Sequence, residues 1–274
     1  PESEMIRVAM LGASGRMGQS IIGCIDSADD FDLSGAVTRP DDPLLGDDAG
    51  VVAGLSPLGI ALTDHLLQGL DKAQVAIDFT LPDALEGNLA ACVSAGAPMV
   101  IGTTGLTERH IEMLEQAAQE IPLVYARNMS VGVNVFIALV AEAARVLGSD
   151  YDCEIIEAHH RHKVDAPSGT ALAVGEAVAE ARGRRLEEVA VRARDGQTGP
   201  RVPDTIGFSV IRGGDIVGEH TAMFVAPEER VEFAHRAVDR RTFARGALRA
   251  ARWVVGRAPG LYSMRDVLGF ESVK

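Results

Sequence analysis

The stretch Ile6-Arg-Val-Ala-Met-Leu-Gly-Ala-Ser-Gly-Arg-Met-Gly18 decides the fold class of this chain. Ile6–Leu11 is a short apolar run rich in strand formers, and an amphipathic run follows the glycines as far as Asp26. Strand, glycine turn and helix in this order form a dinucleotide-binding turn, in which glycines let the backbone approach a pyrophosphate. The spacing is G-x-x-G-x-x-G and differs from the G-x-G-x-x-G template, so a plain strand-to-helix turn is the alternative.

Strand-like and helical runs alternate over the next hundred residues. The expected strands are Phe31–Val37, Gln74–Phe79, Pro98–Ile101 and Leu123–Ala126, and the expected helices are Pro82–Ala95 and Thr107–Gln119. The segment from Pro40 to Thr63 is rich in Pro, Gly and Asp and predicts a long surface loop. This alternation predicts an α/β domain with a Rossmann-like parallel sheet, whose ligands bind beyond the carboxyl ends of the strands.

The residue that follows the second strand bears on the choice of cofactor. An Asp or Glu about 20 residues past the glycines binds the ribose 2′-hydroxyl of NAD. Here Thr38 and Arg39 stand at that place, with acids only later, at Asp41 and Asp42. An arginine accommodates a 2′-phosphate, so NADP is at least as well supported as NAD. A solvated loop charge is the alternative for Arg39, and Arg16 is placed to reach a phosphate or ribose.

The second half changes character. Val131–Leu147 predicts a long buried helix that leads out of the first domain, and Tyr151 begins a second unit. A helix over Thr170–Ala181 and several strand-like runs indicate a smaller α+β domain with a mixed, mostly antiparallel sheet. Those runs are Glu188–Arg192, Thr205–Arg212, Ile216–Val225 and Arg230–His235. A last helix, Arg241–Gly256, carries Arg241, Arg245, Arg249 and Arg252 on one face, which we interpret as a solvated or inter-domain face.

Composition narrows the class of protein. The formal net charge is −13, and residues 1–130 alone hold 6 basic against 19 acidic residues, which argues against nucleic acid as a partner. We identify no basic-then-apolar signal segment at the start, and expect no membrane span, because no apolar run approaches the roughly 20 residues that one needs. The three cysteines, Cys24, Cys92 and Cys153, form no metal-type pair and suggest a reduced, cytoplasmic setting.

The densest chemistry lies in Glu154-Ile-Ile-Glu-Ala-His-His-Arg-His-Lys-Val-Asp-Ala-Pro-Ser-Gly-Thr170. Only 3 of the 26 basic residues are lysines, and one of them, Lys163, stands here. Lysine can give up a proton, whereas arginine cannot, so Lys163 is a candidate for proton transfer or for binding a carboxylate. Ser168-Gly-Thr170, at the expected start of a helix, offers N–H groups and hydroxyls to a second carboxylate. An ordinary helix cap is the alternative for Ser168.

The three histidines of this stretch suggest an acid rather than a metal site. If Glu154–Arg161 is a strand, His160 and His162 point to one side and His159 to the other, which separates the cluster. The chain also lacks H-E-x-x-H, so we predict no metal. A histidine titrates near neutrality and can both take and give a proton. Beside a nicotinamide domain, the pattern indicates hydride addition to a small anionic substrate.

The sequence resembles the 4-hydroxy-tetrahydrodipicolinate reductase family, also called dihydrodipicolinate reductases. The residues that carry the resemblance span nearly the whole chain: Gly12–Gly18, Asp78-Phe-Thr80, Val100–Gly105, Asn128–Asn134, Glu154–Thr170, Gly207-Phe208, Arg212–His220 and Met264–Leu268. The resemblance implies reduction of 4-hydroxy-tetrahydrodipicolinate by NADPH and/or NADH in lysine biosynthesis through diaminopimelate. It also implies a homotetramer, with residues 1–130 and 241–274 binding the dinucleotide and 131–240 binding substrate and forming tetramer contacts.

The resemblance further assigns roles residue by residue. His159 is implied as proton donor and acceptor, Lys163 as proton donor and substrate ligand, and His160, Gly169 and Thr170 as ligands of the dicarboxylate. Cofactor contacts are expected at Gly12, Ala13, Ser14, Gly15, Arg16, Met17, Thr38, Arg39, Phe79, Gly102, Thr103, Thr104, Ala126, Arg127, Asn128 and Met129.

This chain departs from some relatives at two of these positions. Thr38 replaces an acid, which favours NADPH over NADH, and Met129 replaces an aromatic residue. A non-catalytic dinucleotide-sensing protein is the competing class, against which the lysine and histidines argue.

Overall fold

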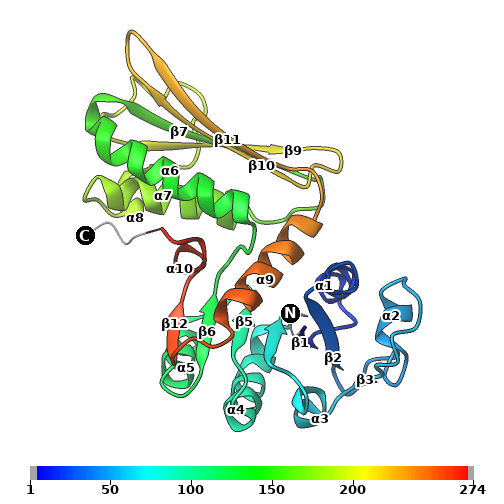
Figure 1. Ribbon diagram of the computed structural model, residues 1–274. Helices are drawn as coiled ribbons and strands as arrows, with labels where there is room; N and C mark the ends of the chain where they lie inside the picture. Colours follow the sequence, from blue (N-terminus) through cyan, green and yellow to red (C-terminus); the bar gives the residue numbers. More distant parts are fainter. Residues whose placement is uncertain (1–4, 271–274) are drawn as a thin grey trace. The chain divides into compact units, whose positions relative to one another are not determined.

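The computed structural model describes residues 5–270, which divide into two compact units (Figure 1). The first unit runs to Val131 and resumes at Arg241, and the second comprises Gly132–Arg240. The second unit is therefore inserted into the chain of the first.

The first unit is built on a seven-stranded sheet in the order β12-β6-β5-β4-β1-β2-β3, in which every pairing of neighbours is parallel. Its strands are β1 (Ile6–Leu11), β2 (Phe31–Val37), β3 (Leu62–Thr63), β4 (Val75–Asp78), β5 (Met99–Ile101), β6 (Pro122–Tyr125) and β12 (Gly260–Tyr262). Its helices are α1 (Arg16–Asp26), α2 (Ala49–Val52), α3 (Leu66–Leu70), η1 (Pro82–Ala84), α4 (Leu85–Ala95), α5 (Glu108–Ala117), α9 (Arg241–Val254) and α10 (Met264–Leu268). The predicted Rossmann-like sheet is confirmed.

Both faces of this sheet are buried, as its continuous apolar strands require. Along β1, Val8 and Met10 join a core that includes α1 and α9, whereas Ala9 and Leu11 join a second core with α4 and α5. Successive side chains of a strand point to opposite faces, so one short strand supplies both cores. In Figure 1, α9 lies beside α1. The C-terminal helix is therefore an integral layer of the first unit.

The loop predicted over Pro40–Thr63 is wrong in part, because it contains α2 and β3. Asp48 makes this local order possible. Its carboxylate caps α2 by accepting from Gly50 and Val51, and it also accepts from the N–H groups of Leu58 and Gly59. One half-buried carboxylate thus ties together a segment whose composition indicates only turns.

The second unit is a five-stranded mixed sheet in the order β11-β10-β7-β9-β8. Its strands are β7 (Asp152–His159), β8 (Ala190–Val191), β9 (Ile206–Arg212), β10 (Gly218–Val225) and β11 (Arg230–Ala237). Strand β10 is antiparallel to β7 and β11, whereas β9 is parallel to β7 and β8. The predicted mixed sheet is confirmed, and its two longest runs of pairing apart from β7–β9 are the antiparallel ones of β10. Its helices are α6 (Val131–Leu147), η2 (Gly148–Asp150), α7 (Gly169–Ala181) and α8 (Leu186–Val189).

One face of this sheet is covered by α6 and α7 (Figure 1). The predicted strand over Glu188–Arg192 is wrong in part, because its first two residues belong to α8. Leu186 and Val189 stand three residues apart, which puts both on the buried side of a helical turn. Only Ala190 and Val191 pair as a strand.

Helix α6 needs a correction of another kind. By length and composition alone, Val131–Asp150 is apolar enough to cross a membrane, contrary to the expectation that no run is long enough. The same helix packs Phe136, Val140 and Ala144 into the core of the second unit, so it is a core helix of that unit. Only 22% of the stretch is buried, and Leu139 and Val146 are exposed, so α6 is less buried than predicted.

Candidate active site

The glycine turn after β1 has the geometry that a dinucleotide requires. Gly12 has a φ of +84°, and a Cβ on it would stand 2.9 Å from the carbonyl oxygen of Phe79. A Cβ on Gly18 would stand 2.2 Å from the carbonyl oxygen of Gly12, so α1 starts hard against the turn. No side chain caps the Gly15 start of α1, which leaves its first N–H groups to a ligand. These features fit the pyrophosphate of a dinucleotide.

A cavity of about 760 Å³ opens beside this turn, entirely within the first unit. It is large enough for half of a dinucleotide. Six of the predicted cofactor residues line it: Gly12, Ser14, Gly15, Thr38, Arg39 and Phe79. The prediction that they form one site is supported by this shared cavity.

Asp42 also lines this cavity, and the sequence analysis did not choose it. Its Oδ2 accepts hydrogen bonds from the hydroxyls of Ser14 and Thr38, both at 2.6 Å. Its Oδ1 accepts from the N–H of Leu44 at 2.9 Å. These bonds, that from Ser14 foremost, lower the pKa of Asp42 to about 2, so the carboxylate is ionised. The signal in the sequence was the acid pair at 41–42, set aside because it follows the expected position by a few residues.

Thr103 lies near this part of the sheet but faces a different group. Its hydroxyl donates to Asp78, a fully buried carboxyl that also accepts from Thr80 and Asn88. Burial is the main influence and raises the pKa of Asp78. Asp78 thus holds the ends of β4 and β5 in register, and the Thr103 side chain is part of that support. Thr103 as a cofactor contact stays a prediction.

The remaining predicted cofactor residues do not line this cavity. Arg16 lines a separate cavity of about 680 Å³ between α1 and α9, together with Arg241, Arg245 and Arg252. The arginine stripe of α9 therefore lies largely along this groove, where Arg252 also pairs with Asp30. The other residues outside the 760 Å³ cavity are Ala13, Met17, Gly102, Thr104, Ala126, Arg127, Asn128 and Met129. Met129 is only 2% exposed, so its side chain belongs to the core.

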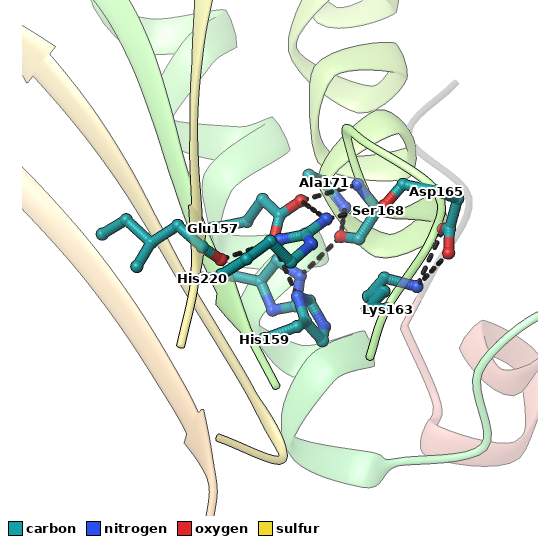
Figure 2. A network of polar contacts seen from close by, with 9 residues as sticks. Glu157, His159, Lys163, Asp165, Ser168, Ala171 and His220 are labelled. Atoms are coloured by element: carbon teal, nitrogen blue, oxygen red, sulfur yellow. Dashed lines mark hydrogen bonds and ion pairs between the residues drawn. The ribbon is translucent and has the colours of Figure 1, made fainter. Parts of the chain in front are cut away.

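In the second unit, the proton-transfer candidates gather around the buried carboxylate of Glu157 (Figure 2). Glu157 and His159 project from the same face of β7, and Nδ1 of His159 lies 2.6 Å from Oε2 of Glu157. Arg212 of β9 donates two hydrogen bonds of 2.8 Å to the same carboxylate. The N–H of Ser168 donates a further bond of 2.9 Å. Strand, neighbouring strand and helix start are therefore joined through one side chain.

The charge state of this pair follows from these contacts. Burial is the largest influence on Glu157 and opposes ionisation, but the donors around it together lower its pKa below the ordinary value. Burial likewise lowers the pKa of His159 and outweighs the opposing effect of the Glu157 carboxylate. His159 is therefore mostly neutral at pH 7. An ionised carboxylate can only accept, so the His159 proton resides on Nδ1 and Nε2 is left as an acceptor.

Space for the His159 ring is provided by a glycine. Gly218 stands opposite His159 across the β7–β10 pair, and a Cβ on it would lie 3.1 Å from Nε2 of His159. His220, two residues further along β10, stacks edge-on against His159 with centroids 5.2 Å apart. Burial and neighbouring charges lower the pKa of His220 to about 3, so it is neutral at pH 7. Sequence reasoning passed over Glu157, Arg212, Gly218 and His220 as site residues, although all lie in motifs quoted above.

Lys163 lies on the loop between β7 and α7 and is bound by Asp165. The Nζ atom lies 2.7 and 2.8 Å from the two carboxylate oxygens of Asp165. This bond lowers the pKa of Asp165. Arg212 also donates to the backbone oxygen of Asp165 at 2.6 Å, which ties the loop to the Glu157 cluster.

The hydroxyl of Ser168 is engaged within the protein. Its Oγ caps α7 by accepting from the N–H of Ala171 at 3.1 Å and lies 3.0 Å from Nε2 of His220. The helix-cap alternative therefore describes this side chain in the structure, and its role as a substrate ligand stays a prediction. Gly169 is exposed and Thr170 half-buried at the start of α7.

His159 belongs to a different element from His160 and His162, and the reason is not the strand alternation that the sequence analysis assumed. Strand β7 ends at His159, so His160 and His162 belong to the following turn, where their ring centroids are 6.3 Å apart. Among residues 5–270, no group of three His, Cys, Asp or Glu side chains is placed to hold a metal ion.

A dinucleotide-type cavity in one unit and a histidine–lysine cluster beside the start of α7 in the other define an oxidoreductase that uses a dinucleotide. Comparison with known proteins gives the family. The family model "Dihydrodipicolinate reductase, N-terminus" matches residues 6–129, and "Dihydrodipicolinate reductase, C-terminus" matches residues 132–268. The chain belongs to the dihydrodipicolinate reductase family.

Individual relatives agree with this assignment. The chain is 53% identical to a 4-hydroxy-tetrahydrodipicolinate reductase of Pseudomonas fluorescens, over 96% of this chain and 99% of that protein. It is 55% identical to one from Alkalilimnicola ehrlichii, over 96% and 98% of the two chains. A dipicolinate-bound dihydrodipicolinate reductase from Paenisporosarcina sp. TG-14 has the same fold, with a TM-score of 0.75 at 22% identity and coverage of 94% and 97%.

Proposed function

We propose that this protein reduces (2S,4S)-4-hydroxy-2,3,4,5-tetrahydrodipicolinate to tetrahydrodipicolinate, with loss of water, in the diaminopimelate route to lysine. The observation that carries the proposal is the cluster in which Glu157 orients His159 beside the Lys163 loop and the start of α7. The balance of the reaction is one hydride and one proton added and one water lost. The reduced dinucleotide supplies the hydride, and the protein must supply the proton and hold the anion.

Lys163 and His159 have different roles in proton transfer. Lys163 is the proton donor, because an ammonium group carries a transferable proton next to a neutral His159. His159 acts through Nε2, which accepts a proton and returns one, while Nδ1 stays bound to Glu157. The two carboxylates of the substrate would displace Asp165 as the partner of Lys163.

The start of α7 is the proposed site for a substrate carboxylate. The Ser168 hydroxyl accepts from the N–H of Ala171, so the proposed donors are the N–H groups of Gly169 and Thr170 in the first turn of α7, where the positive end of the helix dipole attracts an anion. His160 is proposed as a further ligand of the dicarboxylate. The matching partner in the first unit is the dinucleotide cavity lined by Gly12, Ser14, Thr38 and Arg39.

A direct assay tests the proposal. Freshly generated substrate is mixed with the protein and either NADH or NADPH, and the loss of reduced-cofactor absorbance is followed. Substrate-dependent oxidation is expected with at least one cofactor. If the protein binds a dinucleotide but no oxidation occurs, the competing reading of a non-catalytic dinucleotide sensor is correct.

Lys163 variants test the division of labour in the same assay. We expect Lys163→Ala to lower kcat by about 100-fold, within the usual range for loss of a general acid, and to leave dinucleotide affinity unchanged. Lys163→Arg keeps the charge but cannot release a proton, so it should restore substrate KM without restoring kcat. Equal loss of dinucleotide affinity and turnover in Lys163→Ala would contradict the assignment.

We further propose that the protein is a cytoplasmic homotetramer. The face of the five-stranded sheet opposite α6 and α7 carries the half-buried Ile156 and Met223 and the half-exposed Ile211. An apolar sheet face of this kind suits a second copy of the chain. Light scattering should give about four times the chain mass of 28.9 kDa, and Ile211→Glu should lower it.

A further inference from the structure

The ribose end of the cofactor cavity contains an acid that the sequence pattern lacks. The residue after β2 is Thr38, so the usual carboxylate for an NAD ribose is missing there. In the folded chain, Asp42 reaches back and places its carboxylate 2.6 Å from the Thr38 hydroxyl, inside the same cavity. The loop thus supplies from position 42 the charge that position 38 does not have.

The cluster formed by Asp42, Ser14 and Thr38 has more acceptors than donors. The three oxygens lie within 2.6 to 2.7 Å of one another, yet the two hydroxyls contribute only two protons. With both protons directed at the ionised Asp42, the hydroxyl oxygens keep lone pairs that face no donor within the cluster. A ribose diol brings two O–H donors, whereas a phosphate at pH 7 brings a negative charge and further acceptors.

The other charges that line the cavity act in the same direction. Asp64 and Asp83 line it together with Asp42, and Arg39 is the one basic residue among its lining residues. Arg39 is also partly neutralised, because its Nε lies 3.3 Å from Asp41. His65 lies 3.5 Å from Asp64 and is exposed. The lining therefore carries three carboxylates against one guanidinium, a field that opposes a phosphate.

We infer that Asp42 is the residue that selects the cofactor, by binding the adenine ribose hydroxyls of NADH and repelling the 2′-phosphate of NADPH. This inference rests on the proposed reductase function and reverses the preference for NADPH that Thr38 and Arg39 suggest. Arg39 then tolerates NADPH as a weaker second cofactor.

Direct binding tests this inference without the dicarboxylate substrate. NADH and NADPH are titrated into the intact protein and into Asp42→Asn, with Asp47→Asn as a control, because Asp47 is an exposed acid of the same loop outside the cavity. The wild type should bind NADH more tightly. Asp42→Asn should lower the preference for NADH by roughly 10-fold or more, the factor expected for one charge-assisted hydrogen bond. Asp47→Asn should leave the preference unchanged.

A second variant tests the charge argument independently of the loop. Asp64→Asn combined with Asp83→Asn removes two lining charges without touching the Asp42 hydrogen bonds, and should raise the affinity for NADPH by a larger factor than the affinity for NADH. Thermal unfolding of each variant shows whether the loop still folds, and the double variant decides the question if Asp42→Asn does not. Equal losses for both cofactors in Asp42→Asn, or no gain for NADPH in the double variant, would overturn the inference. Failure of the wild type to bind either dinucleotide would instead overturn the proposed function.

Discussion

Glu157 is the residue on which the chemistry of the second unit depends most. Its side chain is 1% exposed and accepts from His159, Arg212 and the Ser168 N–H. A buried carboxylate with this many donors is stable only as a fully satisfied network. It also fixes which nitrogen of His159 carries the proton, a role typical of carboxylates behind catalytic histidines.

We therefore expect Glu157→Gln to impair the orientation of His159 without affecting dinucleotide binding. A neutral amide cannot hold Nδ1–H as firmly, so kcat should fall by about 10- to 100-fold while dinucleotide affinity is unchanged. The Glu157 carboxylate raises the pKa of His159, so its loss should shift the acid limb of the kcat profile to lower pH. Steady-state kinetics from pH 5 to 9 measure both effects. An unshifted limb would show that Glu157 has only a packing role.

His220 makes the stability of the second unit dependent on pH. Its pKa in the folded protein is about 3, whereas an unfolded histidine titrates near 6.5. Between these values the unfolded chain binds a proton that the folded chain excludes, so stability falls as pH drops below 6.5. From this residue alone, we expect a loss of about 2 kcal/mol between pH 6.5 and 5.

Urea unfolding at pH 7 and pH 5, followed by far-UV circular dichroism, measures this dependence. His220→Gln should lose much of the pH effect, whereas His162→Gln, a change at an exposed histidine, should keep it. Trp253, the only tryptophan, lies in the first unit and reports on that unit separately. An unchanged pH effect in His220→Gln would exclude His220 as its source.

At the scale of elements, Gly18 and Gly23 of α1 have different structural roles. Gly18 allows the helix to touch the turn after β1, whereas a Cβ on Gly23 meets nothing within 4 Å. The first glycine is required by a close approach of backbone, and the second merely reduces the stability of the helix. The same argument applies to Gly246 of α9, where a Cβ would stand 1.7 Å from the Met129 carbonyl oxygen.

Alanine at these two positions should change stability in opposite directions. Gly18→Ala should destabilise the first unit by roughly 1–3 kcal/mol through overpacking, and weaken dinucleotide binding. Gly23→Ala should stabilise the same helix by about 0.5–1 kcal/mol. Urea unfolding monitored by Trp253 fluorescence compares them directly. Equal effects would show that the contact of α1 with its turn is not tight.

Over the whole molecule, the first unit closes on itself without the inserted second unit. Ser130 and Thr242 lie on either side of the insertion, with hydroxyl oxygens 3.4 Å apart. The core beneath α1 includes Ala244, Ala247 and Ala251 of α9, so the segment after the insertion completes the first unit. The dinucleotide cavity is lined by this unit alone.

Replacing residues 132–240 by a short Gly-Ser linker should therefore yield a chain that unfolds cooperatively and still binds NADH. It should have no reductase activity, because His159 and Lys163 are lost. A chain that ends at Val131 is the control and should not fold, since it lacks α9. Trp253 fluorescence during thermal unfolding, together with dinucleotide titration, gives the result. Failure of the linked chain to fold would mean that the first unit depends on the second.

The sequence alone determined the first sheet, the glycine turn and the His159–Thr170 stretch. Each of these is encoded locally, by a two- or 3.6-residue apolar period or by residues adjacent in the chain. The short elements α2, α8 and β12 were not predicted from the sequence, because three or four residues carry too little periodicity.

Only the tertiary structure decided which polar side chains meet. Ser14 and Asp42 are 28 residues apart, and Glu157 and Arg212 are 55 apart, so their contacts depend on the path of the loop or the pairing of strands. Contacts of the same kind place the Ser168 hydroxyl beside His220 and the Thr103 hydroxyl on Asp78. The sequence determines which chemical groups are available, and its local periodicity determines the helices and strands that carry them. The fold decides their partners, because burial forces every polar group to find one.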